Sequence, residues 1–493
     1  MNDRAKLEVS AVAAALALGI LGDALLRGFP WGANLALWVG VLTAVIIFLG
    51  RSRSEALAGD GHWLLLPIAA FSLAFLWHDS PALRALNILA LLTAFSLLML
   101  RAQGGHLRLS SLVEYALGSL IAAVNAALGM FPLLFGNPEW KKSLHGGVSR
   151  RVAAVLRGVA FSLLPLLIFG ALLMGADAVF QNLVHRVLHV DFTHLVVIAA
   201  IAFSVGGYLR GLLFGKELNW SLEKRLAPLS LGTLEMGIML CLLDLLFLAF
   251  VVVQIRYFFG GSALVQATTG LTYAEYARRG FFELVAVAAL VLPLLLLIHW
   301  LLPRDDVQAQ RRFRGLAGVQ IVLLFLIMAS AFQRLRLYQA EYGLSEQRLY
   351  PTAFQGWLAV VFVWFALTVL RGRRERFAFG AMVAGFLLLA ILQVLNPDAL
   401  IARTNLARAQ AGRSFDARYA ASLSADAVPE LVAGLPLLNP QDRCTVATRL
   451  LKRWSPPENP DWRSWSQARS RAWQAWRENA PALRAAACSE PKP

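Results

Sequence analysis

Residues 232–253 read GTLEMGIMLCLLDLLFLAFVVV, a run in which only Glu235 and Asp244 carry charge. An α-helix rises 1.5 Å per residue, so this run is long enough to cross about 30 Å of hydrocarbon. Lipid offers the backbone no hydrogen-bond partner, so a segment that crosses it must be a helix or a strand of a closed barrel. The run does not alternate between apolar and polar residues as a barrel strand does, and it therefore predicts a transmembrane helix.

Other apolar runs of similar length fill most of the chain. They lie at 9–26, 31–50, 63–77, 81–100, 111–135, 158–180, 194–214, 281–302, 316–333, 353–370 and 377–395. Of the 493 residues, 58% are hydrophobic and 15% are charged, against about 25% charged in a soluble domain. These values exclude a disordered chain, a coiled coil and an ordinary soluble enzyme. They predict an all-α polytopic transmembrane helix bundle of about 11–12 spans, in which the short run 63–77 is either a span or an interfacial piece.

The composition changes after Leu395. Residues 399–493 carry fourteen Lys/Arg and eight Asp/Glu and contain no run long enough to span a membrane. Leu431, Leu435 and Leu438 recur at helical spacing. We therefore expect three regions: N-terminal transmembrane segments at 1–135, a transmembrane core at 136–398, and a small soluble helical tail at 399–493. In an oxidising compartment, Cys444 and Cys488 of this tail could form a disulfide.

The charge distribution predicts which side of the membrane each loop faces. Lys and Arg gather in cytoplasmic loops, so the net charge of +16 does not by itself indicate a nucleic-acid partner, and none is expected. Regions 136–157, 210–231, 303–315 and 371–376 together carry seventeen Lys/Arg, and the loops that alternate with them carry seven. This bias places the tail outside the cytoplasm. The N-terminal charges disagree if five spans precede residue 136, and most of them agree if 63–77 does not cross.

Six stretches, in a fixed order, resemble a known family. They are 157–180, 253–261, 272–284, 342–350, 395–405 and 423–429, and the fifth of them includes Asn396-Pro397-Asp398. Together they are similar to bacterial polytopic membrane proteins known only as domains of unknown function (the DUF 4153 / DUF 4173 pair). The resemblance covers about residues 150–435 and implies a multi-pass protein of the bacterial cytoplasmic (inner) membrane. It implies no reaction.

Asp244 is the most informative residue for function. It lies about 18 Å into its span, near the bilayer midplane, where a charged side chain costs roughly 2.5–3.5 kcal/mol. Such a residue either binds a proton or cation or bonds to a neighbouring helix for packing. Asp177 and Glu283 lie at span edges within the family-like stretches and are weaker intramembrane candidates.

A second group of candidates faces outward. Gly260-Gly261 permits a sharp turn, and Thr272 with Glu275 predicts a capping box that starts a helix near Tyr273. This helix would carry Tyr276, Arg279 and Glu283 beside Arg256. Arg334, Tyr338 and Glu341 share one face of a helix that leaves the membrane on the same side. These residues form either a site for a ligand or protein partner or a set of interface anchors.

Metal and cofactor signals are weak. His185, His189 and His194 have spacing that can hold a metal ion, but histidines at an interface explain them more simply, and no metal is expected. We find no phosphate loop, Ser-His-Asp set or Cys-x-x-Cys motif, so no cofactor is expected. Three functions remain: a non-catalytic envelope sensor or assembly subunit, which we favour narrowly; a proton- or cation-coupled transporter built around Asp244; and a membrane-embedded enzyme for a lipid-linked substrate. Besides the lipid bilayer, the expected partner is a protein bound by the outward loops and tail.

Overall fold

The computed structural model describes residues 3–51, 57, 59–135, 192–215, 232–269, 281–302 and 306–488, with only the backbone at 255–269. The described residues form helices and no strands. They belong to two compact units: Met1–Leu218 with Glu458–Gln467, and Asn219–Pro457 with Ala468–Pro493. The all-α prediction is therefore confirmed for this part of the chain.

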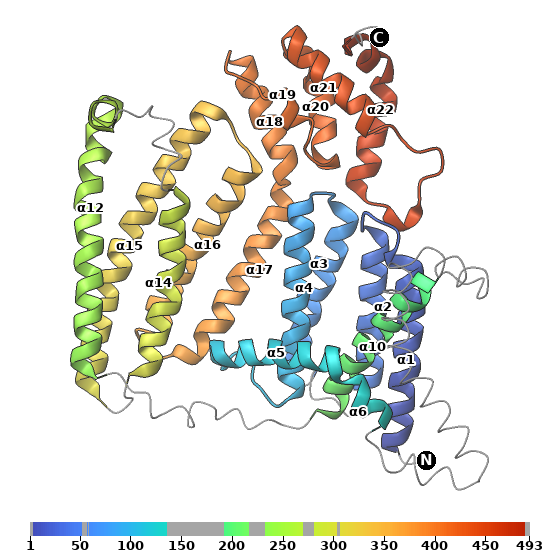
Figure 1. The fold of residues 1–493 in the computed structure, drawn as a ribbon, viewed down its shortest axis with the longest axis vertical. Coiled ribbons are helices and arrows are strands. Elements are labelled where there is room, and N and C mark those ends of the chain that lie inside the picture. The colour runs from blue at the N-terminus through green and yellow to red at the C-terminus, as the bar shows by residue number, and fades with distance from the viewer. Residues whose placement is uncertain are drawn as a thin grey trace, which may run out of the picture. The chain divides into compact units, whose positions relative to one another are not determined.

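The first unit is a bundle of helices, of which those from α1 to α10 are drawn in blue to green in Figure 1. Its elements are α1 (Asp3–Leu26), α2 (Ala33–Gly50), η2 (Gly61–Leu64), α3 (Leu65–Trp77), α4 (Pro81–Ala102), α5 (Leu112–Leu128), α6 (Met130–Phe135), α10 (Phe192–Phe214) and η6 (Trp462–Ser464). Small residues let α1 and α10 approach closely, because a Cβ at Gly19 would lie 2.8 Å from Ala202 Cβ. Close packing of small residues replaces the hydrophobic effect as the force between helices in lipid.

The predicted span 111–135 is not one transmembrane helix. Ser111 and Glu114 form a capping box that begins α5, and the chain turns at Gly129, where a Cβ would lie 2.6 Å from Gly207 O of α10. The result is two helices, and the longer has 17 residues, about 26 Å at 1.5 Å per residue. Figure 1 shows α5 lying across the bundle near the end of α4 rather than along it.

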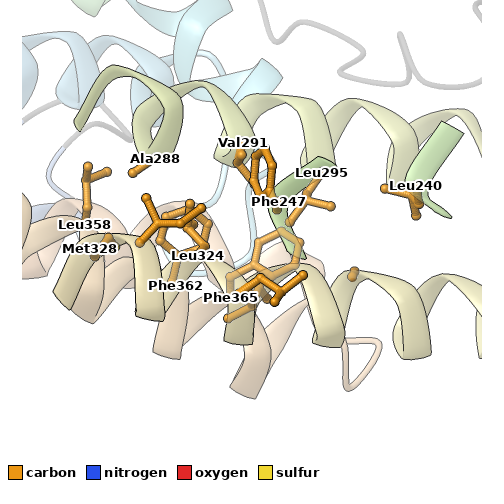
Figure 2. Close-up of a cluster of buried hydrophobic side chains, with 14 of the residues drawn as sticks. Leu240, Phe247, Ala288, Val291, Leu295, Leu324, Met328, Leu358, Phe362 and Phe365 are labelled. Atoms are coloured by element: carbon orange, nitrogen blue, oxygen red, sulfur yellow. The ribbon is translucent and has the colours of Figure 1, made fainter. Parts of the chain in front are cut away.

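The second unit contains the longest helices. Its transmembrane elements are α12 (Thr233–Thr269), α14 (Phe281–Leu301), α15 (Val307–Tyr342), α16 (Glu346–Thr368), η3 (Arg374–Arg376) and α17 (Phe377–Leu395). Figure 2 shows their shared apolar core, to which four helices contribute Leu240, Phe247, Val291, Leu295, Leu324, Phe362 and Phe365. Helix α12 continues through Gly260 and Gly261, so the sharp turn predicted there is absent.

Nine helices among the described residues are long and apolar enough to cross a membrane. They correspond to the predicted spans except 63–77 and 111–135, which form shorter apolar helices, and 158–180, which lies outside the described residues. The chain is therefore a multi-pass membrane protein.

The helices of the tail share an apolar core of their own within the second unit. Its elements are α18 (Pro397–Gln410), α19 (Ala417–Ala420), η4 (Ala425–Ala427), α20 (Val428–Gly434), η5 (Leu435–Leu437), α21 (Pro440–Arg453) and α22 (Gln467–Ala486). The predicted apolar stripe of Leu431, Leu435 and Leu438 is buried in this core. Cys444 and Cys488 form a disulfide with Cα atoms 4.9 Å apart, so the pairing considered from the sequence is confirmed.

We expect the disulfide to stabilise the tail by about 4 kcal/mol, because it closes a loop of 44 residues in the unfolded chain. Alkylation of the denatured protein, read by mass spectrometry, should label Cys241 alone before reduction and all three cysteines after it. The Cys444→Ala/Cys488→Ala variant should show faster hydrogen exchange in α21, whereas Cys241→Ala should not. Three labelled cysteines without reductant would contradict the bridge.

Candidate functional site

The tail is attached to the membrane helices of its unit through a polar contact that we call the tail joint. It comprises residues 338–349, where α15 turns into α16, and residues 396–426, from the start of α18 to η4. Three of the family-like stretches, 342–350, 395–405 and 423–429, therefore meet here. They are far apart in the sequence, and the fold brings them together.

Asn405 of α18 fixes the turn between α15 and α16. Its Oδ1 accepts a hydrogen bond from Leu344 N at 2.8 Å, and its Nδ2 donates to Leu344 O at 2.8 Å. Gly343 precedes this contact with φ = 78°, and a Cβ there would lie 2.5 Å from Asn405 Oδ1. Glycine is thus required both by the left-handed backbone and by the approach of Asn405.

Two arginines close the turn from either side. Arg408 of α18 donates to the carbonyl oxygens of Ala340 and Glu341, the latter at 2.9 Å. Arg348 of α16 donates to Tyr342 O at 3.1 Å, and its guanidinium lies 4.1 Å from the ring centroid of Tyr338. These hydrogen bonds satisfy carbonyl groups at the end of α15 that have no partner within the helix.

Acidic side chains form the interior of the tail joint. Asp398 is 1% exposed, and its Oδ2 accepts a hydrogen bond from Ser424 N at 3.2 Å. Asp426 accepts from Ser424 Oγ and from Asn396 Nδ2, each at 3.2 Å. Burial raises the pKa of Asp398 to about 6; the hydrogen bonds from Ser424 oppose this, and the nearby charges of Glu346 and Asp426 add to it. The joint therefore contains a carboxyl group that changes charge just below neutral pH.

Asp244 lies in the membrane core, apart from the tail joint. It is 8% exposed and sits between Leu240 and Phe247 on the buried face of α12. In the part of the chain that the structure describes, neither of its carboxylate oxygens has a hydrogen-bond partner. The sequence did not point to Gln320 of α15, which is fully buried and likewise lacks a partner among the described residues. The available signal was a glutamine within the apolar run 316–333, whose other polar residues, Ser330 and Gln333, lie near its end.

The remaining intramembrane and outward candidates do not gather into one site. Glu283 is exposed in the first turn of α14, and the described residues show no bond between it and Asp398. Arg334 donates to Gln254 of α12 at 2.5 Å, Tyr338 stacks on Arg348, and Glu341 is exposed. The predicted helix through these three residues is confirmed, because α15 continues to Tyr342. Other predicted positions lie outside the described residues or side chains, namely Asp177, Arg256, Tyr276, Arg279, His185 and His189.

His194 is held by an ion pair at the end of α1. Its Nδ1 lies 2.5 Å from Asp23 Oδ2, and its Nε2 lies 3.1 Å from Arg27 Nη1. Arg27 also pairs with Asp23 at 2.7 Å. Among the described residues, no group of three or more His, Cys, Asp or Glu side chains lies close enough to hold a metal ion.

The fold and its two polar regions define a multi-pass helical membrane protein with a folded, disulfide-bonded tail. Residues 65–434 match the model of a protein family described as a domain of unknown function (DUF4153). The match covers most of the chain, which therefore belongs to this family, and the resemblance seen in the sequence is confirmed. No curated protein and no solved structure matches the chain.

We expect the tail joint to lose stability as the pH rises from about 4 to about 6. Folded Asp398 binds a proton more tightly than the unfolded chain does, since its pKa is about 6 instead of 3.8. Above pH 6, this difference in pKa lowers the free energy of unfolding by at most about 3 kcal/mol relative to its value at low pH. Asp398→Asn can still accept a hydrogen bond from Ser424 N but carries no charge, so it should be more stable than the parent at pH 7.5 and similar at pH 4.

Hydrogen exchange of the amides in α20 in the full chain would measure this difference. The matched control is Glu478→Gln, which makes the same change at an exposed position of α22. A parent protein whose protection, corrected for intrinsic exchange, does not depend on pH between 4 and 7.5 would contradict the prediction.

Proposed function

We propose that this protein is a non-catalytic subunit of the bacterial cytoplasmic membrane, acting as a sensor or assembly component whose extracytoplasmic tail binds a protein partner. The tail joint is the observation that carries the proposal. Its family-like residues bond to backbone groups, Asn405 to Leu344 and Asp398 to Ser424, and the neighbouring Arg408 bonds to the carbonyl oxygens of Ala340 and Glu341. Side chains used in this way hold two parts of a protein in one orientation, and they are not free to act on a substrate.

The direction of the helices in the first unit supports an extracytoplasmic tail. Tail residues Arg463 and Trp465 bond to Ala24 O and Ala33 N, at the end of α1 opposite the N-terminus. If the tail is outside, the N-terminus is inside. The ends of α2 and α4 lie on the N-terminal side as well, because Asp60, just after α2, pairs with Arg101 of α4 at 3.2 Å.

This arrangement removes the conflict in the N-terminal charges. Because α5 lies across the bundle, the N-terminal region has one span fewer than the apolar runs suggest, and 63–77 can cross. Arg4, Lys6, Arg51, Arg101 and Arg108 then all belong to the cytoplasmic side, as the positive-inside rule requires. The disulfide gives independent support, since such bonds persist in oxidising compartments.

The topology is tested with reporter fusions. Alkaline phosphatase fused after Pro493 should be active, and a fluorescent protein that matures only in the cytoplasm should be dark there. A control pair inserted after Gly372, in an arginine-rich loop, should give the opposite signals. A fluorescent fusion with inactive phosphatase at Pro493 would reject the extracytoplasmic tail.

The partner is tested by photo-crosslinking in intact cells. A photoreactive amino acid at Leu437, an apolar tail residue that is 48% exposed, should give one discrete protein adduct, whereas the same group at Leu367 of α16 should give none.

Asn405→Ala should weaken this adduct, because it removes two hydrogen bonds worth about 1–3 kcal/mol together. The matched control is Asn479→Ala, which loses the hydrogen bond that the Asn479 side-chain amide donates to Ala475 O within α22. Absence of a protein adduct at Leu437, or an adduct that Asn405→Ala leaves unchanged, would count against the proposal.

A further inference from the structure

Helices α12 and α15 run in the same direction and contact each other along their length (Figure 1). Thr233 Oγ1 bonds to Asp306 Oδ2 at 3.0 Å near their first residues. Gln254 Oε1 accepts from Ser330 Oγ at 3.2 Å and from Arg334 Nη2 near the other side of the membrane. These bonds fix the register of two parallel helices.

Along each helix, a set of buried and half-buried positions follows the alternating spacing of three and four residues that is typical of a coiled-coil seam. On α12 these positions are the buried Leu240, Asp244, Phe247 and Val251 and the half-buried Thr233, Gly237 and Gln254; on α15 they are the buried Phe313, Gln320, Leu323, Ile327 and Ser330 and the half-buried Leu316 and Arg334. Gln254 and Ser330 are bonded directly across this seam. Ten residues before each of them lie Asp244 and Gln320.

Equal steps along two parallel helices give equal rise and equal rotation. The Gln254–Ser330 bond therefore places Asp244 and Gln320 in one layer of the seam. The same register sets Leu240 beside Leu316 and Phe247 beside Leu323, so this polar layer has an apolar layer on each side. Both side chains are more than nine-tenths buried, and neither has a hydrogen-bond partner among the described residues.

We propose that Asp244 and Gln320 form a proton-binding site in the α12–α15 seam. The protonated carboxyl of Asp244 donates its O–H to Gln320 Oε1, and the Gln320 amide donates to the carboxyl C=O. Two hydrogen bonds then satisfy both groups without net charge. Release of the proton leaves a carboxylate in an apolar layer, so the strength of the seam depends on proton occupancy.

No described charged group is placed to substitute for the proton. On α12, Glu235 is nine residues from Asp244; Cys241 is nearer but exposed. On α15, Arg314 is six residues before Gln320 and exposed, and Arg334 is fourteen residues after it and bonded to Gln254. The ionisable groups of α14, Glu283 and His299, and those of α16, Glu346, Arg348 and Tyr350, lie in the terminal turns of their helices.

Infrared difference spectroscopy of the purified full chain in lipid tests the site. A protonated carboxyl C=O band should be present at pH 7, should be lost in Asp244→Asn, and should be unchanged in Glu235→Gln, an exposed position on the same helix. Gln320→Met is similar in size but cannot accept the O–H strongly, so it should shift the band to higher frequency. Exchange into D₂O should shift the band of the parent protein to lower frequency, because the carboxyl proton is exchangeable.

Each measurement can overturn the proposal. A carboxylate at position 244 that is ionised from pH 5 to pH 8 would show that no proton is bound. A protonated band that Gln320→Met leaves unshifted would show that the amide is not its partner. A band that does not shift in D₂O would show that the carboxyl proton never exchanges with water, so that the pair is a structural contact and not a proton-binding site. This measurement needs no variant and is therefore independent of how well variants fold.

Discussion

Hydrocarbon neither donates nor accepts a hydrogen bond, and this constraint governs where polar groups lie in the transmembrane region. The backbone meets it by forming helices. Buried amide side chains meet it by reaching backbone carbonyls: Asn34 donates to Leu25 O, Gln103 to Gly211 O and Gln355 to Met328 O. Asp244 and Gln320 depart from this pattern, since neither bonds to backbone or side chain in the described part of the chain. In the α12–α15 seam, Asp244 and Gln320 therefore either satisfy each other's hydrogen-bonding groups or leave them unsatisfied.

The tail is stabilised by different means from the transmembrane helices. A domain of this size buries a small core, and a disulfide adds to what that core supplies. The tail joint then uses hydrogen bonds to backbone atoms of the α15–α16 turn. Their geometry depends on the path of the chain at Gly343, and so a change in the angle between α15 and α16 would be transmitted directly to α18. The joint thereby fixes the direction of α18 relative to the α15–α16 turn.

The transmembrane helices could be predicted from the sequence because burial in lipid is a local property of an apolar run. Features that depend on distant contacts could not. Segment 111–135 is apolar enough to span, but it forms two helices that meet at Gly129, where the chain approaches Gly207 of α10. Asp398 lies in a family-like stretch but was not among the predicted site residues, and its partner Ser424 is 26 residues away. Gln320 was one of three polar residues in the run 316–333, and its role depends on its register with Asp244.

A buried polar pair in a helix seam can have a purely structural role, since one polar layer is enough to fix register and orientation. That role requires hydrogen bonding but not ionisation, and asparagine at position 244 would supply it at lower cost in lipid. The α12–α15 seam is moreover already held near both ends, by the Thr233–Asp306 bond and by the bonds of Gln254 to Ser330 and Arg334. A third register-fixing layer between them would be redundant. The carboxyl group at the centre is therefore better explained by the one property that an amide lacks, its ability to bind and release a proton.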